Sequence, residues 1–195
     1  MAITLVAVLV MAGQSRDGQA IAPEAVYRAV LQDQRCGGRG ASGARGDRPV
    51  LYRERVDPAA QEWWQYAPPA ALVERLPGMM PGLRAEFLRE FLRINAISSE
   101  WDREAARQLG ADLVSRIELE QMAKRAWIWD ALFARFPSAS ALVEMSQVAI
   151  DSDRGTALVY CGASTNALAG RGFLVLLRYS DGRWMPTLWQ MLWES

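Results

Sequence analysis

The 195-residue sequence contains no histidine, only two cysteines and a single lysine, Lys124. Without histidine the chain lacks the most common general base and the most common metal ligand, which excludes Ser-His-Asp and Cys-His catalysis and any histidine-containing zinc site. Two cysteines are also too few for a four-thiolate metal site. The formal net charge is zero, so composition provides no overall attraction to nucleic acid or to an anionic membrane. We therefore expect no cofactor, no metal and no nucleic-acid partner.

Long hydrophobic runs are also missing. The most apolar stretch, residues 1–12 (MAITLVAVLVMA), is too short to span a bilayer as a helix. It is typical of the apolar part of a secretory signal, with Val10 and Ala12 at the small-residue positions before a cleavage at Gly13, although it has no basic residue ahead of it. The alternative is a buried strand that includes residues 3–6. We expect an exported protein, periplasmic or secreted, with no membrane span in the mature chain.

Residues 37–49 (GGRGASGARGDRP) contain motifs that have known functions in other contexts. The glycines from Gly38 match G-x-G-x-x-G, but a dinucleotide site needs a strand before this motif and a helix after it, and neither pattern is present. Arg-Gly-Asp at 45–47 is a tripeptide that recurs by chance. The Arg-Gly spacing lacks the interleaved aromatic residues of single-strand RNA-binding segments. A solvated loop is the simplest interpretation.

Helical patterns fill much of the region between residues 22 and 137. A first helix is predicted over 22–35, with Pro23 near its start, and the most amphipathic segment covers 82–95. A helix-like stretch begins at 57, and proline-rich breaks are predicted at 68–69 and 76–81. Ser98 or Ser99 is predicted to cap a further helix, with Asp102 completing a capping box. Its pattern continues to about residue 136, with Gly110 as a possible break.

The C-terminal region is patterned as strands. Four apolar, β-rich runs cover residues 142–150, 156–161, 173–179 and 183–193, and residues 162–172 are predicted to form a loop of small residues. Asp181-Gly182 predicts a tight hairpin, because a type I′ turn needs positive φ at both central residues. Pro186 cannot donate to a ladder and indicates an edge or a bulge. Residues 49–56 are a candidate fifth strand at the sheet edge.

In the last two predicted strands, large apolar side chains occur at both odd and even positions. We therefore expect both faces of the sheet to be at least partly buried. Burial under helices explains this pattern, and a contact surface is the alternative. Trp63, Trp64, Trp189 and Trp193 are the candidate contact residues. The adjacent pair Trp63 and Trp64 could stack a sugar or a base, although packing in a core or interface is the simpler interpretation.

The two cysteines, Cys36 and Cys161, could form a disulfide in an exported protein, tying the first helix to the second strand of the sheet. The alternative is two unlinked thiols that pack in the core. The sequence alone does not provide the Cα separation that would decide between them.

Residues suited to catalysis are few. Glu118 and Glu120 are too close in a helix to share a face, whereas Glu100 and Glu104 are predicted to share one. Asp151 and Asp153 are explained by a turn. Residues 164–166 (Ser-Thr-Asn) have no predicted base to activate a hydroxyl. We identify no catalytic residue and regard an enzyme as the less favoured class.

Several segments together resemble a family of uncharacterised exported bacterial proteins. They are residues 87–95, 115–120, 136–138, 146–148, 157–160, 168–172, 182–184 and 193–195. The resemblance covers most of the chain after Pro49 and implies a leader, a helical body and a C-terminal antiparallel sheet, but no activity. The chain departs from the pattern in having Ser-Ala-Ser after Pro137 and Cys161 inside the second strand.

The sequence therefore predicts one α+β domain over residues 13–195, mainly helical over 13–137, with N-terminal helices packed on a C-terminal four-stranded antiparallel meander over 138–195. The favoured function is a non-enzymatic exported protein that binds another protein, for example as an inhibitor or immunity protein. The alternative is a small-ligand binder or hydrolase with a pocket between sheet and helices. A buried carboxyl group with a shifted pKa would favour that alternative.

Overall fold

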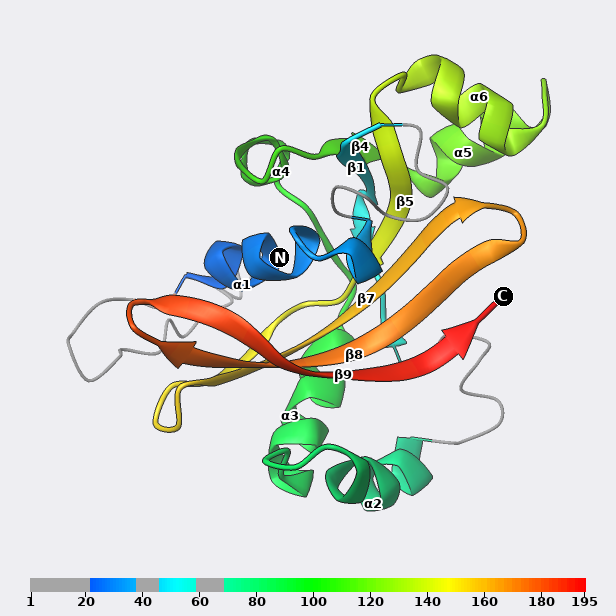
Figure 1. Ribbon diagram of the computed structural model, residues 1–195. Coiled ribbons are helices and arrows are strands. Elements are labelled where there is room, and N and C mark those ends of the chain that lie inside the picture. Colours follow the sequence, from blue (N-terminus) through cyan, green and yellow to red (C-terminus); the bar gives the residue numbers. More distant parts are fainter. Residues whose placement is uncertain (1–21, 38–45, 59–68) are drawn as a thin grey trace, which may run out of the picture.

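A computed structural model describes residues 22–37, 46–58 and 69–195 (Figure 1). The described chain has the expected α+β architecture, with six α-helices and a mostly antiparallel seven-stranded sheet. The helices are α1 (Pro23–Leu31), α2 (Pro69–Met79), α3 (Ala85–Asn95), α4 (Arg103–Gln108), α5 (Arg116–Ala123) and α6 (Ile128–Arg135), with a short 3-10 helix η1 (Gln34–Cys36). Among the described helices, none has both the length and the apolar character needed to cross a membrane.

The large sheet has the strand order β4-β1-β5-β7-β8-β9, with β6 paired to β7. Its strands are β1 (Arg48–Tyr52), β4 (Asp112–Val114), β5 (Ala139–Met145), β6 (Ala149–Asp151), β7 (Thr156–Asn166), β8 (Ala169–Ser180) and β9 (Arg183–Glu194). Two further short strands, β2 (Glu54–Arg55) and β3 (Ser99–Glu100), pair with each other. The sheet is thus wider than the predicted four-stranded meander.

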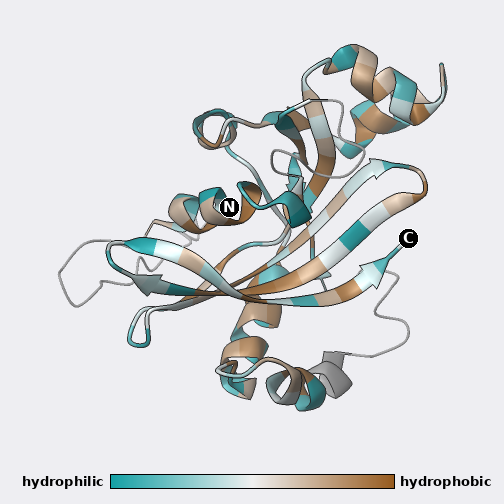
Figure 2. Ribbon diagram, in the orientation of Figure 1, coloured by the Kyte–Doolittle hydropathy of each residue, from teal (hydrophilic) through white to brown (hydrophobic). Residues whose placement is uncertain are grey.

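Helices cover both faces of the long strands (Figure 1). Along β7, Val159 and Cys161 belong to the buried cluster that includes α1, whereas Leu158 and Tyr160 belong to the cluster that includes α2 and α3. A third cluster joins β1 and β5 to α5 and α6. Figure 2 shows that β8 is apolar along its middle and more hydrophilic toward its ends. Burial on two faces therefore explains why the last strands are apolar on both alternations.

The two C-terminal hairpins differ in how well the sequence predicts them. The turn at Asp181 and Gly182 is confirmed, with φ of 53° and 76°, and Pro186 lies in the edge strand β9 next to a register shift. The loop predicted at residues 162–172 is wrong, because β7 extends to Asn166 and β8 begins at Ala169. Small residues are typical of loops, but here they form a strand face that allows close approach of another side chain.

The run predicted as one strand over 142–150 is divided into β5 and β6. The ladder to β7 pairs Met145 with Cys161 and then Ala149 with Leu158, which leaves one extra residue on the β5–β6 side. At this bulge the Ser146 hydroxyl accepts a hydrogen bond from the Tyr160 N–H at 2.9 Å. A side chain thus takes over one position of the backbone ladder, which a local pattern does not reveal.

Residues 49–56 do not form an edge strand. Instead β1 lies inside the sheet, parallel to β4 on one side and to β5 on the other. Parallel neighbouring strands need crossover connections, which the helices between these strands supply. Because the paired strands are far apart in the sequence, the alternation of residues within one strand does not predict their pairing. Residues 54–55 leave the large sheet and pair with β3.

The long helical pattern after residue 98 is interrupted by strands. Asp102, rather than Ser98 or Ser99, caps α4, and its carboxylate accepts hydrogen bonds from the backbone N–H groups of Glu104 and Ala105 at 2.9 and 3.0 Å. Gly110 then adopts φ of 73° and ends the helical segment, and β4 follows. Glu100 lies in β3 and Glu104 in α4, so the expectation that these acids share one helix face is wrong.

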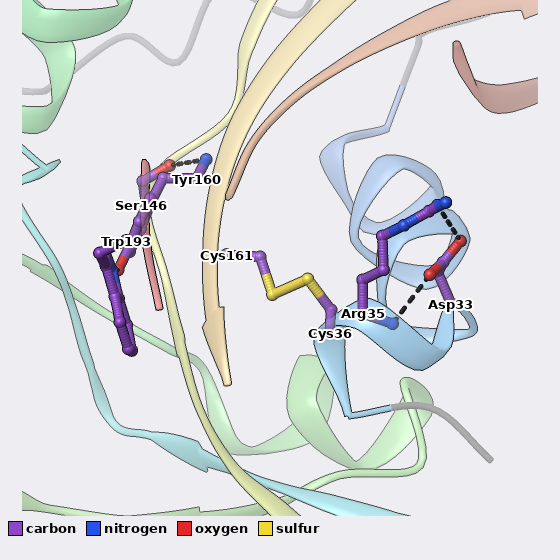
Figure 3. The surroundings of a disulfide bond; sticks show 7 residues. All are labelled: Asp33, Arg35, Cys36, Ser146, Tyr160, Cys161 and Trp193. Carbon is purple, nitrogen blue, oxygen red and sulfur yellow. Dashed lines mark hydrogen bonds and ion pairs between the residues drawn. A yellow bond between two sulfur atoms is a disulfide. The ribbon is translucent and has the colours of Figure 1, made fainter. Parts of the chain in front are cut away.

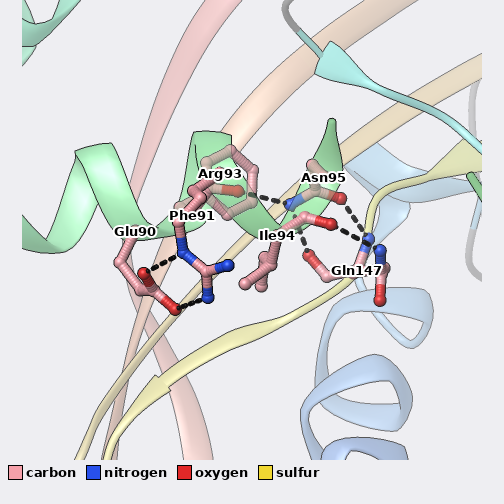
Figure 4. Close-up of polar contacts among 6 residues, drawn as sticks. All are labelled: Glu90, Phe91, Arg93, Ile94, Asn95 and Gln147. Carbon is pink, nitrogen blue, oxygen red and sulfur yellow. Dashed lines mark hydrogen bonds and ion pairs between the residues drawn. The ribbon is translucent and has the colours of Figure 1, made fainter. Parts of the chain in front are cut away.

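The amphipathic segment over 82–95 is confirmed as α3, although the helix begins only at Ala85. Its C-terminal end is fixed to the β5–β6 connection by Asn95, as Figure 4 shows. The Asn95 amide donates to the carbonyls of Phe91 at 2.8 Å and Gln147 at 3.2 Å, and its oxygen accepts from the Gln147 N–H at 2.6 Å. Separately, α2 continues through Pro77, so the break predicted at 76–81 falls after Met79.

The disulfide between Cys36 and Cys161 is confirmed, with a Cα–Cα distance of 6.1 Å (Figure 3). It joins the end of η1 to β7, and both cysteines are fully buried. The adjoining Gly37 adopts φ of 79°, and its carbonyl accepts a hydrogen bond from the Ser140 hydroxyl at 2.7 Å. The N-terminal helical segment is therefore attached to the centre of the sheet by both a covalent bond and a hydrogen bond.

Candidate functional site

The candidate site is a groove of about 1050 Å³ on the face of the sheet beside α5 and α6. We call it the sheet groove. Its floor includes Tyr52 from β1, Glu144 from β5, and Gly162 and Ser164 from β7. Arg116 at the start of α5 and residues 128–129 at the start of α6 also line it, as do residues 54–57. This volume is slightly above the range of about 300–1,000 Å³ that is typical of small-molecule sites.

The floor of the sheet groove follows one row of neighbouring residues across the sheet. Glu144 pairs with Gly162, Gly162 with Gly172, and Gly172 with Trp193. Since Leu51 pairs with Val143 in the parallel ladder, the next residue, Tyr52, adjoins Glu144. Side chains in one row stand on the same face of a sheet. The row therefore crosses five strands and places Tyr52, Glu144 and Trp193, which are distant in the sequence, on one face of the sheet.

Two glycines of β8 make room for the Trp193 indole. A methyl group built on Gly172 would clash directly with the Trp193 indole nitrogen, and one on Gly170 would lie 3.0 Å from the ring. The Trp193 indole N–H donates a hydrogen bond to the Tyr160 hydroxyl at 3.0 Å. Trp193 thus lies over a strip of small residues and forms one end of the sheet groove.

Glu144 is the carboxyl group at the centre of the row. Burial raises its pKa above the ordinary value, and the nearby Arg116 guanidinium opposes this shift without reversing it. Within the chain segments that the structure describes, no hydrogen bond contributes to the environment of this carboxyl group. This partly buried carboxyl group is therefore available to a ligand that supplies a hydrogen bond.

Tyr52 and Arg116 surround Glu144. Burial, together with the charges of Glu144 and Glu54, raises the pKa of Tyr52 to about 12, while Arg116 acts in the opposite direction. Tyr52 is therefore a neutral hydroxyl at physiological pH. The Arg116 guanidinium carbon lies 5.3 Å from the centre of the Tyr52 ring, and this cation–π contact holds the arginine at the groove.

Arg116 is placed by the start of α5. The Ser115 hydroxyl accepts from the Glu118 N–H at 3.2 Å, and the Glu118 carboxylate accepts from the Ser115 N–H at 2.8 Å, which is a reciprocal capping box. These hydrogen bonds hold the pKa of Glu118 below its ordinary value. Glu118 is therefore a structural carboxylate, and Arg116 is the first residue of the helix that it fixes.

Arg55 also lines the sheet groove. Its guanidinium carbon lies 4.5 Å from the centre of the Trp101 ring and 5.6 Å from that of Tyr27. The Arg55 Nε atom and the Trp101 indole nitrogen are buried without a hydrogen-bond partner in the described structure. Arg55 is thus held by aromatic contacts at the wall that residues 54–57 form.

The other residues predicted for a contact surface have separate locations. Trp189 packs edge-on against Phe173 at 5.6 Å, with the Arg35 guanidinium 5.1 Å above it, on the face that carries α1. Trp193 lies on the opposite face with Tyr160; Figure 3 shows Trp193 and the disulfide on opposite sides of β7. Trp63, Trp64 and the predicted signal segment 1–12 lie outside the described residues.

The sequence did not single out Glu144, Tyr52 or Arg116. Glu144 is the one charged residue in the apolar run of β5, and this was the available signal. Elsewhere, Asp151 is engaged by Arg84 at 2.7 Å, in agreement with a structural role. No group of three or more potential metal ligands occurs within the described part of the chain.

Comparisons with protein-family models, with curated proteins and with solved structures found no match to this chain. The functional argument therefore depends on the residues of the sheet groove.

Proposed function

We propose that this protein is an exported binding protein whose sheet groove takes a small, hydrogen-bonding ligand. The observation that supports this most strongly is Glu144, a partly buried carboxyl group with a raised pKa beside the neutral hydroxyl of Tyr52. Groups with perturbed pKa values concentrate at functional sites, because folding alone gains little from them. The geometry supports the pocket hypothesis more directly than a flat protein-contact surface.

Binding is proposed rather than catalysis. The sequence has no histidine, and the groove offers Ser164 as a hydroxyl without a basic side chain suited to activate it. Glu144 and Arg116 together provide a hydrogen-bonding carboxyl group and a fixed donor array. These groups suffice to orient a ligand.

Export is part of the proposal. A buried disulfide persists in oxidising compartments and is rare where thiols are kept reduced. Cell fractionation, with alkylation of free thiols and non-reducing electrophoresis, tests this directly. Oxidised protein in the envelope or medium fraction supports export, and reduced protein in the cytosol would contradict it.

The binding proposal is tested with a thermal-shift screen of amino acids, dipeptides, nucleotides, small carboxylates and saccharides. Glu144→Ala should weaken the binding of any hit by about tenfold, because it removes one buried hydrogen-bonding group. Glu120→Ala is the matched control, since Glu120 is exposed on α5 and does not line the groove. A hit that binds equally to the wild type and to Glu144→Ala would show that the sheet groove is not its site.

A protein partner is the second proposal, supported by the β9 edge. β9 has twelve residues and exposes Met185 and Met191, and among the strands that the structure describes it pairs only with β8. Long edge strands are available for pairing with another chain, although Pro186 and the two register shifts limit this. Affinity capture with wild type and with a Met185→Lys/Met191→Lys variant tests the proposal. A stoichiometric partner that both forms retain equally would show that the β9 edge is not the contact.

A further inference from the structure

We infer that the ligand of the sheet groove is an uncharged oligosaccharide. This inference rests on the proposed binding function and specifies its ligand class. It follows from the placement of aromatic rings, the type of polar side chain between them, and the balance of charge.

Aromatic rings lie on both sides of the central carboxyl group. Tyr52 belongs to β1, and Trp193 lies over Gly162 of β7, so these rings flank Glu144 of β5. Two strand spacings separate β1 from β7, or about 10 Å. Trp129 of α6 adds a third ring at the wall. Flat rings offer apolar faces that can pack against the C–H faces of sugar rings.

The polar groups between the rings are suited to hydroxyl ligands. A carboxyl group can donate and accept, and the planar guanidinium of Arg116 can donate to two neighbouring oxygens at once. Vicinal hydroxyls of a sugar present this spacing of donors and acceptors. Tyr52, neutral because its pKa is about 12, adds another hydroxyl that can donate or accept.

The charges that line the groove exclude a strongly charged ligand. Two arginines are offset by three acids, namely Arg55, Arg116, Glu54, Asp57 and Glu144. A polyanion such as a nucleic acid needs an excess of basic residues along its path. This near balance of charge favours an uncharged ligand.

The floor also disfavours an extended peptide. An extended peptide usually binds by adding a strand to a free sheet edge. Here the floor is a sheet face, and the strands β1, β5 and β7 each have paired neighbours on both sides. Side chains rather than backbone groups therefore contact the ligand. A sugar can hydrogen-bond to the polar side chains through its hydroxyls and pack against the aromatic side chains through its ring faces.

The test uses the full mature chain with four neutral hexasaccharides, namely those of cellulose, chitin, starch and xylan, followed by tryptophan fluorescence and calorimetry. A hexamer of galacturonic acid serves as the anionic comparison. We expect at least one neutral hexamer to bind, and more tightly than the anionic one. Trp129→Ala should weaken this binding by about tenfold through loss of ring stacking.

Each variant has a matched control nearby. Trp127 is 62% exposed and does not line the groove, so Trp127→Ala should leave binding unchanged. Arg116→Ala provides a second test that does not remove core packing, because Arg116 is exposed. Arg125, which is also exposed but does not line the groove, provides the control variant Arg125→Ala. Circular dichroism establishes that each variant is folded.

The outcomes separate this inference from the binding proposal. If no neutral hexamer binds at millimolar concentration but the broader screen finds a ligand that depends on Glu144, the oligosaccharide inference is wrong and the groove proposal stands. If a hexamer binds equally to Trp129→Ala and Arg116→Ala, the inference is also wrong. If neither experiment finds a ligand sensitive to Glu144→Ala, both proposals fail.

Discussion

Replacing both disulfide cysteines, in Cys36→Ala/Cys161→Ala, should lower the free energy of unfolding by about 5 kcal/mol. The bond spans a sequence separation of 125 residues. In the chain-entropy treatment, closing a loop of this length removes roughly 16 cal/mol/K from the unfolded chain, which is about 5 kcal/mol at 25 °C. Since a domain of this size has a total stability of about 5–15 kcal/mol, the loss is a large fraction of it.

Urea unfolding, followed by tryptophan fluorescence and circular dichroism, measures this difference. The variant should show a lower midpoint, and also a larger dependence on urea, because the unfolded chain without the cross-link exposes more surface. The wild type should reach the same low stability only after reduction in denaturant, since both cysteines are fully buried and resist reductant in the native state. A stability loss below about 1 kcal/mol, with an unchanged urea dependence, would refute the loop-entropy reasoning.

Three further perturbations test the packing and the electrostatics around the groove. Gly172→Ala should displace the Trp193 indole, because a new methyl group would clash with the indole nitrogen, and should shift tryptophan fluorescence while destabilising the fold by roughly 1–3 kcal/mol. Asn95→Asp keeps the side-chain shape but removes the amide that donates to two carbonyls, so urea unfolding should show a loss of roughly 2 kcal/mol. Glu144→Gln should be more stable than wild type at neutral pH, and the difference should vanish at acidic pH.

The sign of the pH effect follows from the direction of the Glu144 shift. Burial raises the folded-state pKa above the unfolded value near 4.5, so the folded protein holds its proton to higher pH. Stability from this group is therefore greatest at low pH, and it falls as pH rises from the unfolded pKa through the folded one. A Glu144→Gln curve parallel to wild type across this window would contradict the assignment.

Matched controls accompany these variants. Gly78 lies in α2 with open space around its Cα, so Gly78→Ala should raise stability by about 0.5–1 kcal/mol rather than lower it. Glu120→Gln should change the free energy of unfolding at neutral pH by less than about 0.5 kcal/mol, because this side chain is exposed. If Gly78→Ala destabilised as much as Gly172→Ala, the close approach of Trp193 would not explain the effect.

Features that depend on neighbouring residues could be predicted from the sequence. The Asp181-Gly182 hairpin follows from a turn that needs positive φ, and α3 follows from apolar residues at helical spacing. The apolar runs of the C-terminal sheet could be predicted in the same way, because they also depend on the residue types of neighbouring positions. The disulfide was one of two open alternatives, because pairing depends on a distance that no local pattern supplies.

Features that depend on pairing between distant segments could not be predicted from the sequence and were found in the three-dimensional structure. β1 is an interior strand because it pairs in parallel with both β4 and β5, which are connected to it through helices. β4 was not predicted, because its residues lie within a sequence pattern that indicates a helix. The small residues over 162–172 lie in strands, where their size leaves space for the Trp193 indole to pack above them. Trp193 is more than twenty residues from Gly172 along the chain, so a local pattern does not show this contact. Glu144 acquires its raised pKa only when β1, β7 and α5 surround it. The candidate site is therefore a product of strand order, and strand order depends on contacts between distant parts of the chain.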